Sequence, residues 1–212
     1  MIEINYLLII VAAFLAMASP GPATLAIAGT SMSQGRLYGA TLAAGTLTGS
    51  FFWSCSAAFG LSAIMYTNVW LFELVRYVGA CYLVFLAYKA TRSAIYHKDV
   101  EIKSISKSSL MKTYLRGVAI HLTNPKAILF FGSLYAIGIP ANTAPQDLIK
   151  VIGVVGLESL IIFQGYAYIF SIPKVRSVYL KLRRWFEAFF AVIFGVAGFK
   201  ILTAKLDSLL RV

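Results

Sequence analysis

The residues of this chain that could do chemistry are few, and two are charged side chains deep in apolar sequence. Lys126 lies near the middle of a long apolar segment, and Glu158 lies at a similar depth in the next one. A lysine at the centre of a membrane helix costs on the order of 2.5 to 3.5 kcal/mol, so it needs a partner or a task. We expect Lys126 to bind an anionic group or exchange a proton, and Glu158 to be its ion-pair partner or a coupling carboxylate. The alternative is that Lys126 forms a structural ion pair, or that its side chain extends to the membrane–water interface.

Prolines form a second pattern. Pro20-Gly21-Pro22 interrupts one apolar segment, and Asn124-Pro125 interrupts another about a hundred residues later. A proline inside a helix frees the carbonyl four residues before it, and lipid cannot satisfy that carbonyl. We therefore expect the two breaks to line one binding site, in which freed carbonyls accept hydrogen bonds and new helix starts donate them. Simple kinks, with Asn124 as a helix cap, are the alternative.

The composition indicates whether the chain folds in water or in a lipid bilayer. It is 59% apolar and 13% charged, with a mean hydropathy of +0.79. Residues 4–35 and 37–72 contain no Asp, Glu, Lys or Arg, and such long apolar runs are typical of membrane spans. We therefore predict an all-α integral membrane protein. The net charge of +11 does not predict a nucleic-acid partner, because most basic residues lie in a few connections between spans.

Six spans are predicted. They cover residues 5–29, 39–65, 71–95, 114–139, 146–172 and 185–206, with a turn at 31–38 and a basic turn at 174–184. The first and fourth contain the proline motifs. A single membrane domain, 1–212, thus divides into two inverted three-helix repeats, about 1–95 and 114–212, joined by a polar linker at 96–113. The basic connections should face the cytoplasm, which places both termini outside.

The motifs also resemble a known family, the LysE/RhtB family of amino-acid exporters. The matching motifs are Ser19-Pro20-Gly21-Pro22, Gly45-x-x-x-Gly49, Gly79-Ala80-x-Tyr82-Leu83 and Asn124-Pro125-Lys126-Ala127-Ile128-x-Phe130-Phe131. The resemblance implies a multi-pass carrier of the bacterial inner membrane that exports amino acids or their derivatives, coupled to protons or the membrane potential. It also implies a possible homodimer. Gly45 and Gly49 form a small-xxx-small face, which favours close helix packing, and an exposed glycine face would also serve a dimer. Ser50 departs from the family, because many relatives have an acidic residue there; that role would be vacant or taken by Glu158.

An amino acid is a zwitterion, so its site needs acceptors for an ammonium and donors for a carboxylate. The breaks would supply the carbonyls of Ala16, Ala18 and His121, and the N–H groups near Ala23, Thr24, Ala127 and Ile128. Pro20, Gly21, Pro22, Asn124, Pro125 and Lys126 are accordingly the predicted substrate-binding residues. The His121 side chain itself is assigned to packing.

Two other classes of function are weighed against an amino-acid exporter. A divalent-cation exporter of a related six-span type would need several intramembrane Asp or His ligands, and Glu158 is the one acid found. An intramembrane enzyme would need a nucleophile with a base, or a metal cluster, and neither pattern is present. We therefore predict no catalytic residues, no metal site and no cofactor.

Overall fold

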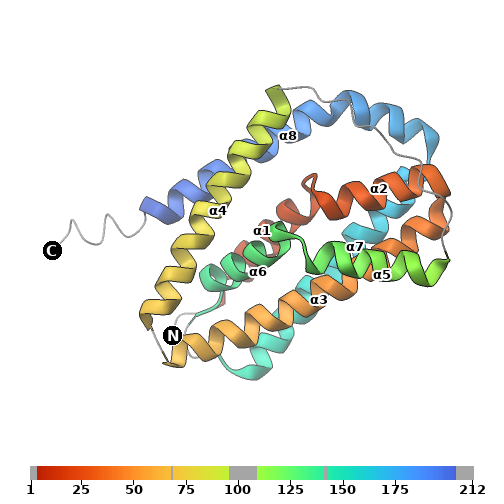
Figure 1. Cartoon of the computed structure of the whole chain (residues 1–212). Helices are drawn as coiled ribbons and strands as arrows, with labels where there is room; N and C mark the ends of the chain where they lie inside the picture. The colour runs from red at the N-terminus through yellow and green to blue at the C-terminus, as the bar shows by residue number, and fades with distance from the viewer. Residues whose placement is uncertain (1–3, 68, 96–108, 141–142, 204–212) are drawn as a thin grey trace.

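The computed structural model describes residues 4–67, 69–95, 109–140 and 143–203. Within these ranges the chain forms eight helices and no strand (Figure 1), which confirms the all-helical prediction. In chain order they are α1 (Tyr6–Ala18), α2 (Pro22–Gln34), α3 (Arg36–Thr67), α4 (Val69–Ile95), α5 (Leu110–Leu122), α6 (Pro125–Gly138), α7 (Pro145–Phe170) and α8 (Pro173–Thr203).

Two pairs of helices are interrupted where the prolines predict. α1 ends before the first proline motif and α2 begins at Pro22, with a bend of 51° between them. α5 ends at Leu122 and α6 begins at Pro125. Proline suits the first position of a helix, because the N–H that it lacks would be unpaired there and its fixed φ is already helical. The breaks predicted in the first and fourth spans are therefore confirmed.

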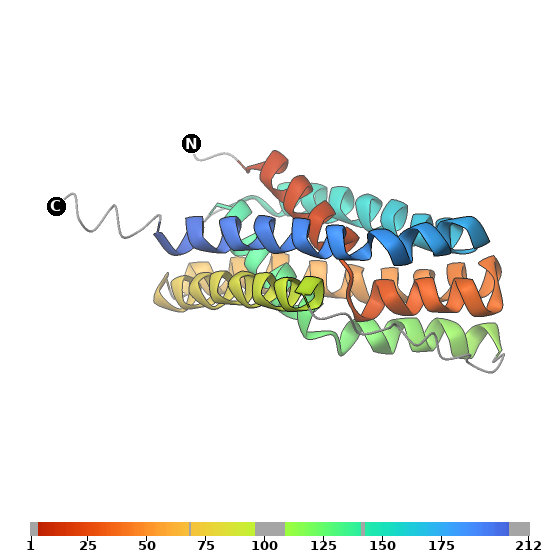
Figure 2. The same ribbon diagram turned by 90° about the horizontal axis from the view of Figure 1, so that it is seen from above.

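The helices pack side by side into an elongated bundle (Figure 2). α4 lies along α8 on one side, and α3 lies against α5 and α7 on the other. The four short helices on either side of the two breaks pack against one another, and two of them also pack against α7. α1 contacts α6 and α7, and α2 contacts α5 and α7. The two breaks are thus enclosed by longer helices.

α3 and α5 approach so closely that only glycine fits between them. An added Cβ at Gly45 would lie 2.0 Å from the carbonyl oxygen of Tyr114, and one at Gly117 would lie 2.2 Å from a carbonyl oxygen of α3. A Cβ at Gly49 would lie 2.8 Å from the Cβ of His121. Small residues allow this kind of close helix packing in membrane proteins. The glycine face is therefore buried inside the chain. The close helix packing that Gly45 and Gly49 predict is confirmed, and the prediction that this face is exposed for a dimer is wrong.

Two predicted connections differ from the structure. The basic turn predicted at 174–184 is helical, because α8 begins at Pro173 and continues through it; Lys and Arg are good helix formers, and the helix extends beyond the apolar stretch. The turn predicted at 31–38 shrinks to Gly35, whose φ of 91° favours glycine. Most of the linker predicted at 96–113, and the end of the sixth span after residue 203, lie outside the described residues; α5 begins at Leu110.

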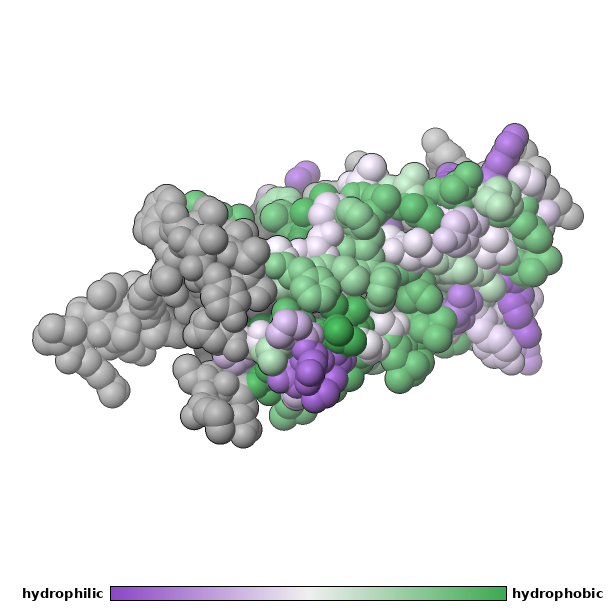
Figure 3. All heavy atoms as spheres, turned by 90° about the horizontal axis from the view of Figure 1, so that it is seen from below, coloured by the Kyte–Doolittle hydropathy of each residue, from purple (hydrophilic) through white to green (hydrophobic). Residues whose placement is uncertain are grey.

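The outer surface is rich in large apolar side chains. Figure 3 shows apolar residues over much of the visible face, with hydrophilic ones in a few patches. Among the most exposed are Phe51, Ile161, Val192 and Phe199. Water-soluble monomers rarely expose extended apolar patches, whereas a lipid-facing surface consists of them. By length and apolar composition, α7 is the one described helix that could cross a bilayer alone, and the bent pair α1 and α2 could cross it as a single span. The six-span arrangement stays a prediction.

Candidate functional site

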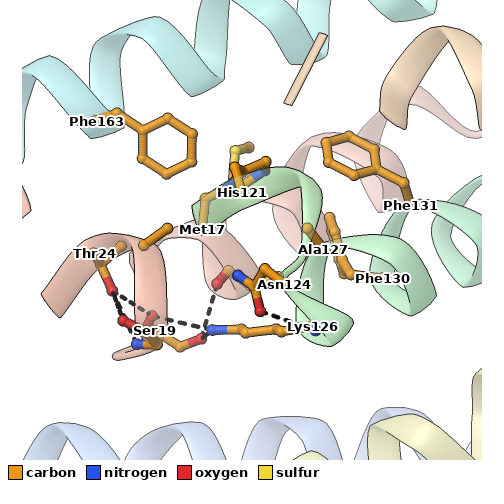
Figure 4. Close-up of a pocket in the computed structure, with 13 residues that line it drawn as sticks. Met17, Ser19, Thr24, His121, Asn124, Lys126, Ala127, Phe130, Phe131 and Phe163 are labelled. Atoms are coloured by element: carbon orange, nitrogen blue, oxygen red, sulfur yellow. Dashed lines mark hydrogen bonds between the residues drawn. The ribbon is translucent and has the colours of Figure 1, made fainter. Parts of the chain in front are cut away.

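The two breaks meet around one pocket. It has a volume of about 40 Å³, which is room for about three water molecules. Its lining comes from the end of α1, the start of α2, both sides of the second break, and α7 (Figure 4). The lining residues are Ala16, Met17, Ser19, Gly21, Ala23, Thr24, His121, Asn124, Lys126, Ala127, Phe130, Phe131 and Phe163. Segments about a hundred residues apart in sequence thus form a single site.

Lys126 joins the two breaks. Its Nζ donates one hydrogen bond to the carbonyl oxygen of Ser19, at 3.1 Å, and another to the Ser19 Oγ. The lysine side chain passes over Gly21, where an added Cβ would lie 3.3 Å from Nζ. The ammonium therefore lies beside the start of α2, where the helix dipole is also positive. The Lys126 ammonium and the N-terminus of α2 both face the pocket, and together they suit an anionic group such as a carboxylate.

Asn124 caps α6. Its Oδ1 accepts a 3.1 Å bond from the backbone N–H of Lys126. Its carbonyl oxygen accepts bonds of 2.9 Å from the Ala127 N–H and 3.2 Å from the Ile128 N–H. The prediction that Ala127 and Ile128 offer free donors is therefore wrong, because the cap and the first helical turn already use them. The cap residue of α2 is Gly21, which has no side chain to do the same, so the start of α2 is the better anion site.

The carbonyls that the prolines free are bonded within the protein. The Ala16 carbonyl accepts a 2.8 Å bond from a serine hydroxyl at the end of α1. The Ala18 carbonyl accepts a 2.6 Å bond from the hydroxyl of Tyr166 on α7. The His121 carbonyl accepts a 3.2 Å bond from a backbone N–H at the second break. The prediction that these oxygens are unpaired is wrong, and Tyr166 is a positioning residue that sequence reasoning missed.

Pro20 and Pro22 shape the first break and do not line the pocket. Gly21 contributes to the lining, whereas Pro20 is half-buried and Pro22 exposed, both outside it. Pro125 starts α6 and so sets the position of Lys126 at its first turn. The structure therefore brings Gly21, Asn124 and Lys126 together, with the three prolines as supports.

Glu158 lies on α7, outside the pocket lining. Its Oε2 is buried and has no hydrogen-bond partner among the described residues. The neighbouring Ser159 donates to the Met17 sulfur at 3.0 Å, and its Oγ lies 3.1 Å from that of Ser50. Ser50 is fully buried, so α3 and α7 make a neutral contact at this position.

His121 lines the pocket, whereas a lone histidine on a membrane helix is predicted to serve packing. Its side chain is 5% exposed, and its ring lies edge-to-face with Phe163 at a centroid distance of 5.7 Å. Neither ring nitrogen has a hydrogen-bond partner in the described part of the chain. The available signal was its position four residues before Pro125, at the end of the helix that the proline interrupts.

Interrupted helices that line a small pocket, within a bundle covered by apolar side chains, are typical of membrane transport proteins. The chain belongs to the LysE type translocator family, whose family model matches residues 13–205, and this confirms the resemblance seen in the sequence. It is a transporter and not an enzyme.

Curated relatives agree with this assignment. The chain is 28% identical to a threonine efflux protein of Salmonella typhi over 90% of its own length and 93% of the relative's. It is 27% identical to the threonine efflux protein of Escherichia coli K12, with the same coverage. It is 30% identical to a leucine efflux protein of Klebsiella pneumoniae subsp. pneumoniae over 85% of this chain and 84% of that one. No solved structure matches the chain.

Proposed function

We propose that this protein exports small neutral or cationic amino acids, or their derivatives, across the bacterial inner membrane. The observation that carries the proposal is the meeting of Lys126 with the start of α2 in a pocket built from both broken helices. The relatives named for threonine and leucine efflux support the same class of substrate.

The contacts of Lys126 suggest how a zwitterion binds. The carbonyl and hydroxyl oxygens of Ser19 accept hydrogen bonds from the Lys126 ammonium. An arriving substrate would exchange these partners: its carboxylate pairs with Lys126 and the start of α2, and its ammonium takes the oxygens of Ser19. Because each charge finds a partner, the exchange leaves no unpaired charge in the membrane interior.

The packing of the helices supports two inverted repeats. If α1, α2, α3 and α4 correspond to α5, α6, α7 and α8, most contacts have an equivalent. The contact of α1 with α6 matches that of α2 with α5, and the contact of α1 with α7 matches that of α3 with α5. The α3–α7 and α4–α8 contacts are then the two symmetric ones. We therefore propose six spans, both termini outside, and alternating access by rocking of the two halves about the pocket.

Export needs a driving force, and we propose the proton gradient or the membrane potential. Glu158 is the candidate coupling carboxylate, because its Oε2 is buried without a hydrogen-bond partner among the described residues. We also propose a homodimer, which would form through a surface other than the buried glycine face. Within the described residues, no three His, Cys, Asp or Glu side chains are grouped to hold a metal ion, so a divalent cation ranks below an amino acid as cargo.

Counterflow in proteoliposomes tests the proposal. Purified protein is reconstituted in vesicles loaded with one unlabelled amino acid, and uptake of the radiolabelled form is followed; divalent cations are tested in the same way. We expect counterflow with small amino acids and none with the cations. Counterflow of a cation, or of no amino acid at all, would overturn the proposed function.

A further inference from the structure

The far wall of the pocket has one polar side chain. Across from Lys126, the lining is apolar, formed by Met17, Phe131, Phe163 and their neighbours. The exception is His121, which Figure 4 shows between Phe163 and Phe131. The carboxylate and ammonium of a bound amino acid are assigned to the opposite wall, so the substrate side chain is the part that faces His121.

His121 is held in place by packing. An added Cβ at Gly49 would lie 2.8 Å from the Cβ of His121, so α3 closes one side of the residue. The Phe163 ring closes another, at a centroid distance of 5.7 Å. Both ring nitrogens nevertheless lack a partner in the described structure. Leaving such buried groups unpaired is costly, so a ligand that pairs with them gains affinity.

The chemistry of imidazole selects the ligand group. A neutral imidazole has one donor and one acceptor, and a hydroxyl group can serve either. An aliphatic side chain can pair with neither. Three phenylalanine rings line the pocket, so a small side chain fits between them more readily than a large one.

We infer that His121 is a specificity-determining residue that hydrogen-bonds the hydroxyl group of a small substrate side chain. It thereby makes the carrier prefer a hydroxylated amino acid over an aliphatic one of the same shape. This inference rests on the proposed function, since it concerns the same pocket.

Threonine and valine provide the test, because they have nearly the same shape and differ by a hydroxyl in place of a methyl. A site that hydrogen-bonds a hydroxyl rejects the analogue without it far more strongly than an apolar pocket separates such a pair. We expect the wild-type protein to carry threonine about tenfold to hundredfold more efficiently than valine, measured as counterflow at limiting concentration. Serine and 2-aminobutyrate form a second pair with the same expectation.

Substitution then assigns the preference to the residue. His121→Phe keeps a ring beside Phe163 and removes both nitrogens, so the threonine-to-valine ratio should fall at least tenfold. If the larger phenylalanine ring disturbs folding, His121→Leu is used in its place and should lower the ratio in the same way. His121→Gln keeps a donor and an acceptor and should retain most of the preference. Phe51→Leu, at an exposed position on α3 outside the pocket lining, is the control for the loss of an aromatic ring and should leave the ratio within about threefold of wild type.

The outcomes separate this inference from the proposed function. If the wild-type protein carries no amino acid at all, the proposed function fails, and if it carries other amino acids but neither threonine nor valine, the inference alone is overturned. If it carries threonine and valine equally well, the inference alone is overturned. An unchanged ratio in both apolar variants, or an equal loss of both substrates in them, would also overturn it, because His121 would then serve packing or the shared backbone of the substrate.

Discussion

Replacing Lys126 by methionine keeps much of the side-chain length and removes the ammonium. In the structure this ammonium bonds the Ser19 carbonyl and hydroxyl and lies beside the start of α2. We propose that it also binds the carboxylate of the substrate. Transport and stability should therefore respond differently to the substitution, and this difference separates a binding role from a purely structural one.

The size of each effect follows from the contacts. A hydrogen bond to a charged group contributes about 1.5 to 3 kcal/mol, so losing the carboxylate contact should lower kcat/KM about tenfold to 150-fold. For the folded state, removing a charge from the membrane interior gains about 2.5 to 3.5 kcal/mol on insertion scales. Loss of the bonds to Ser19 costs a similar amount, so the two terms offset and stability should change by no more than about 1 kcal/mol.

The assay combines counterflow of the best amino-acid substrate with thermal unfolding of the purified protein. Lys150→Met is the matched control, because Lys150 is exposed and pairs with Asp147 one turn away; it should change neither quantity. Unchanged transport by the Lys126→Met variant would refute the reasoning. A large loss of stability that accounts for the loss of transport would refute it too, since Lys126 would then be a structural link between the breaks.

Three further predictions concern the supports of the site. Tyr166→Phe removes the hydroxyl that bonds the Ala18 carbonyl and should lower the free energy of unfolding by about 1 to 2 kcal/mol; an unchanged denaturation midpoint would contradict this. Gly45→Ala should cost about 1 to 3 kcal/mol and reduce transport, because the new Cβ would lie 2.0 Å from a carbonyl oxygen of α5, whereas Gly153→Ala, with nothing within 4 Å, should be neutral; equal effects in thermal unfolding would argue against the tight crossing. Asn124→Ala removes the cap on α6 and should cost about 1 kcal/mol in the same measurement, and no cost would mean that the cap is dispensable.

Much of the fold could be predicted from the sequence because its strongest signals are local. A proline ends one helix and starts the next wherever it stands, so the breaks at Pro22 and Pro125 follow from sequence alone. The secondary structure of residues 174–184 is harder to predict, because their basic side chains suit a cytoplasmic connection and a helix equally well. The burial of Gly45 depends on which helix packs against it, and spacing within one helix does not carry that information.

The candidate site could also be predicted in part from local sequence signals, while the rest depends on packing between helices. The motifs identified Gly21, Asn124 and Lys126, which lie together at the pocket. Sequence reasoning assumed that the groups freed by proline stay unpaired, and it missed the hydroxyl of Tyr166 that reaches the break from another helix. His121 was missed for a related reason: its importance depends on the absence of partners for its ring nitrogens within the described structure, and only the packed helices reveal that.

The central claim is that both broken helices contribute to one substrate site, and substrate protection of single cysteines tests it most directly. With Cys55 and Cys81 replaced by alanine, Ala23→Cys probes the start of α2 and Ala127→Cys the start of α6, because both residues line the pocket. Ile149→Cys, at an exposed position on α7, is the unprotected control. We predict that the transported amino acid slows thiol labelling at both pocket positions with the same half-maximal concentration. Protection at one of them alone, or at neither, would contradict the claim.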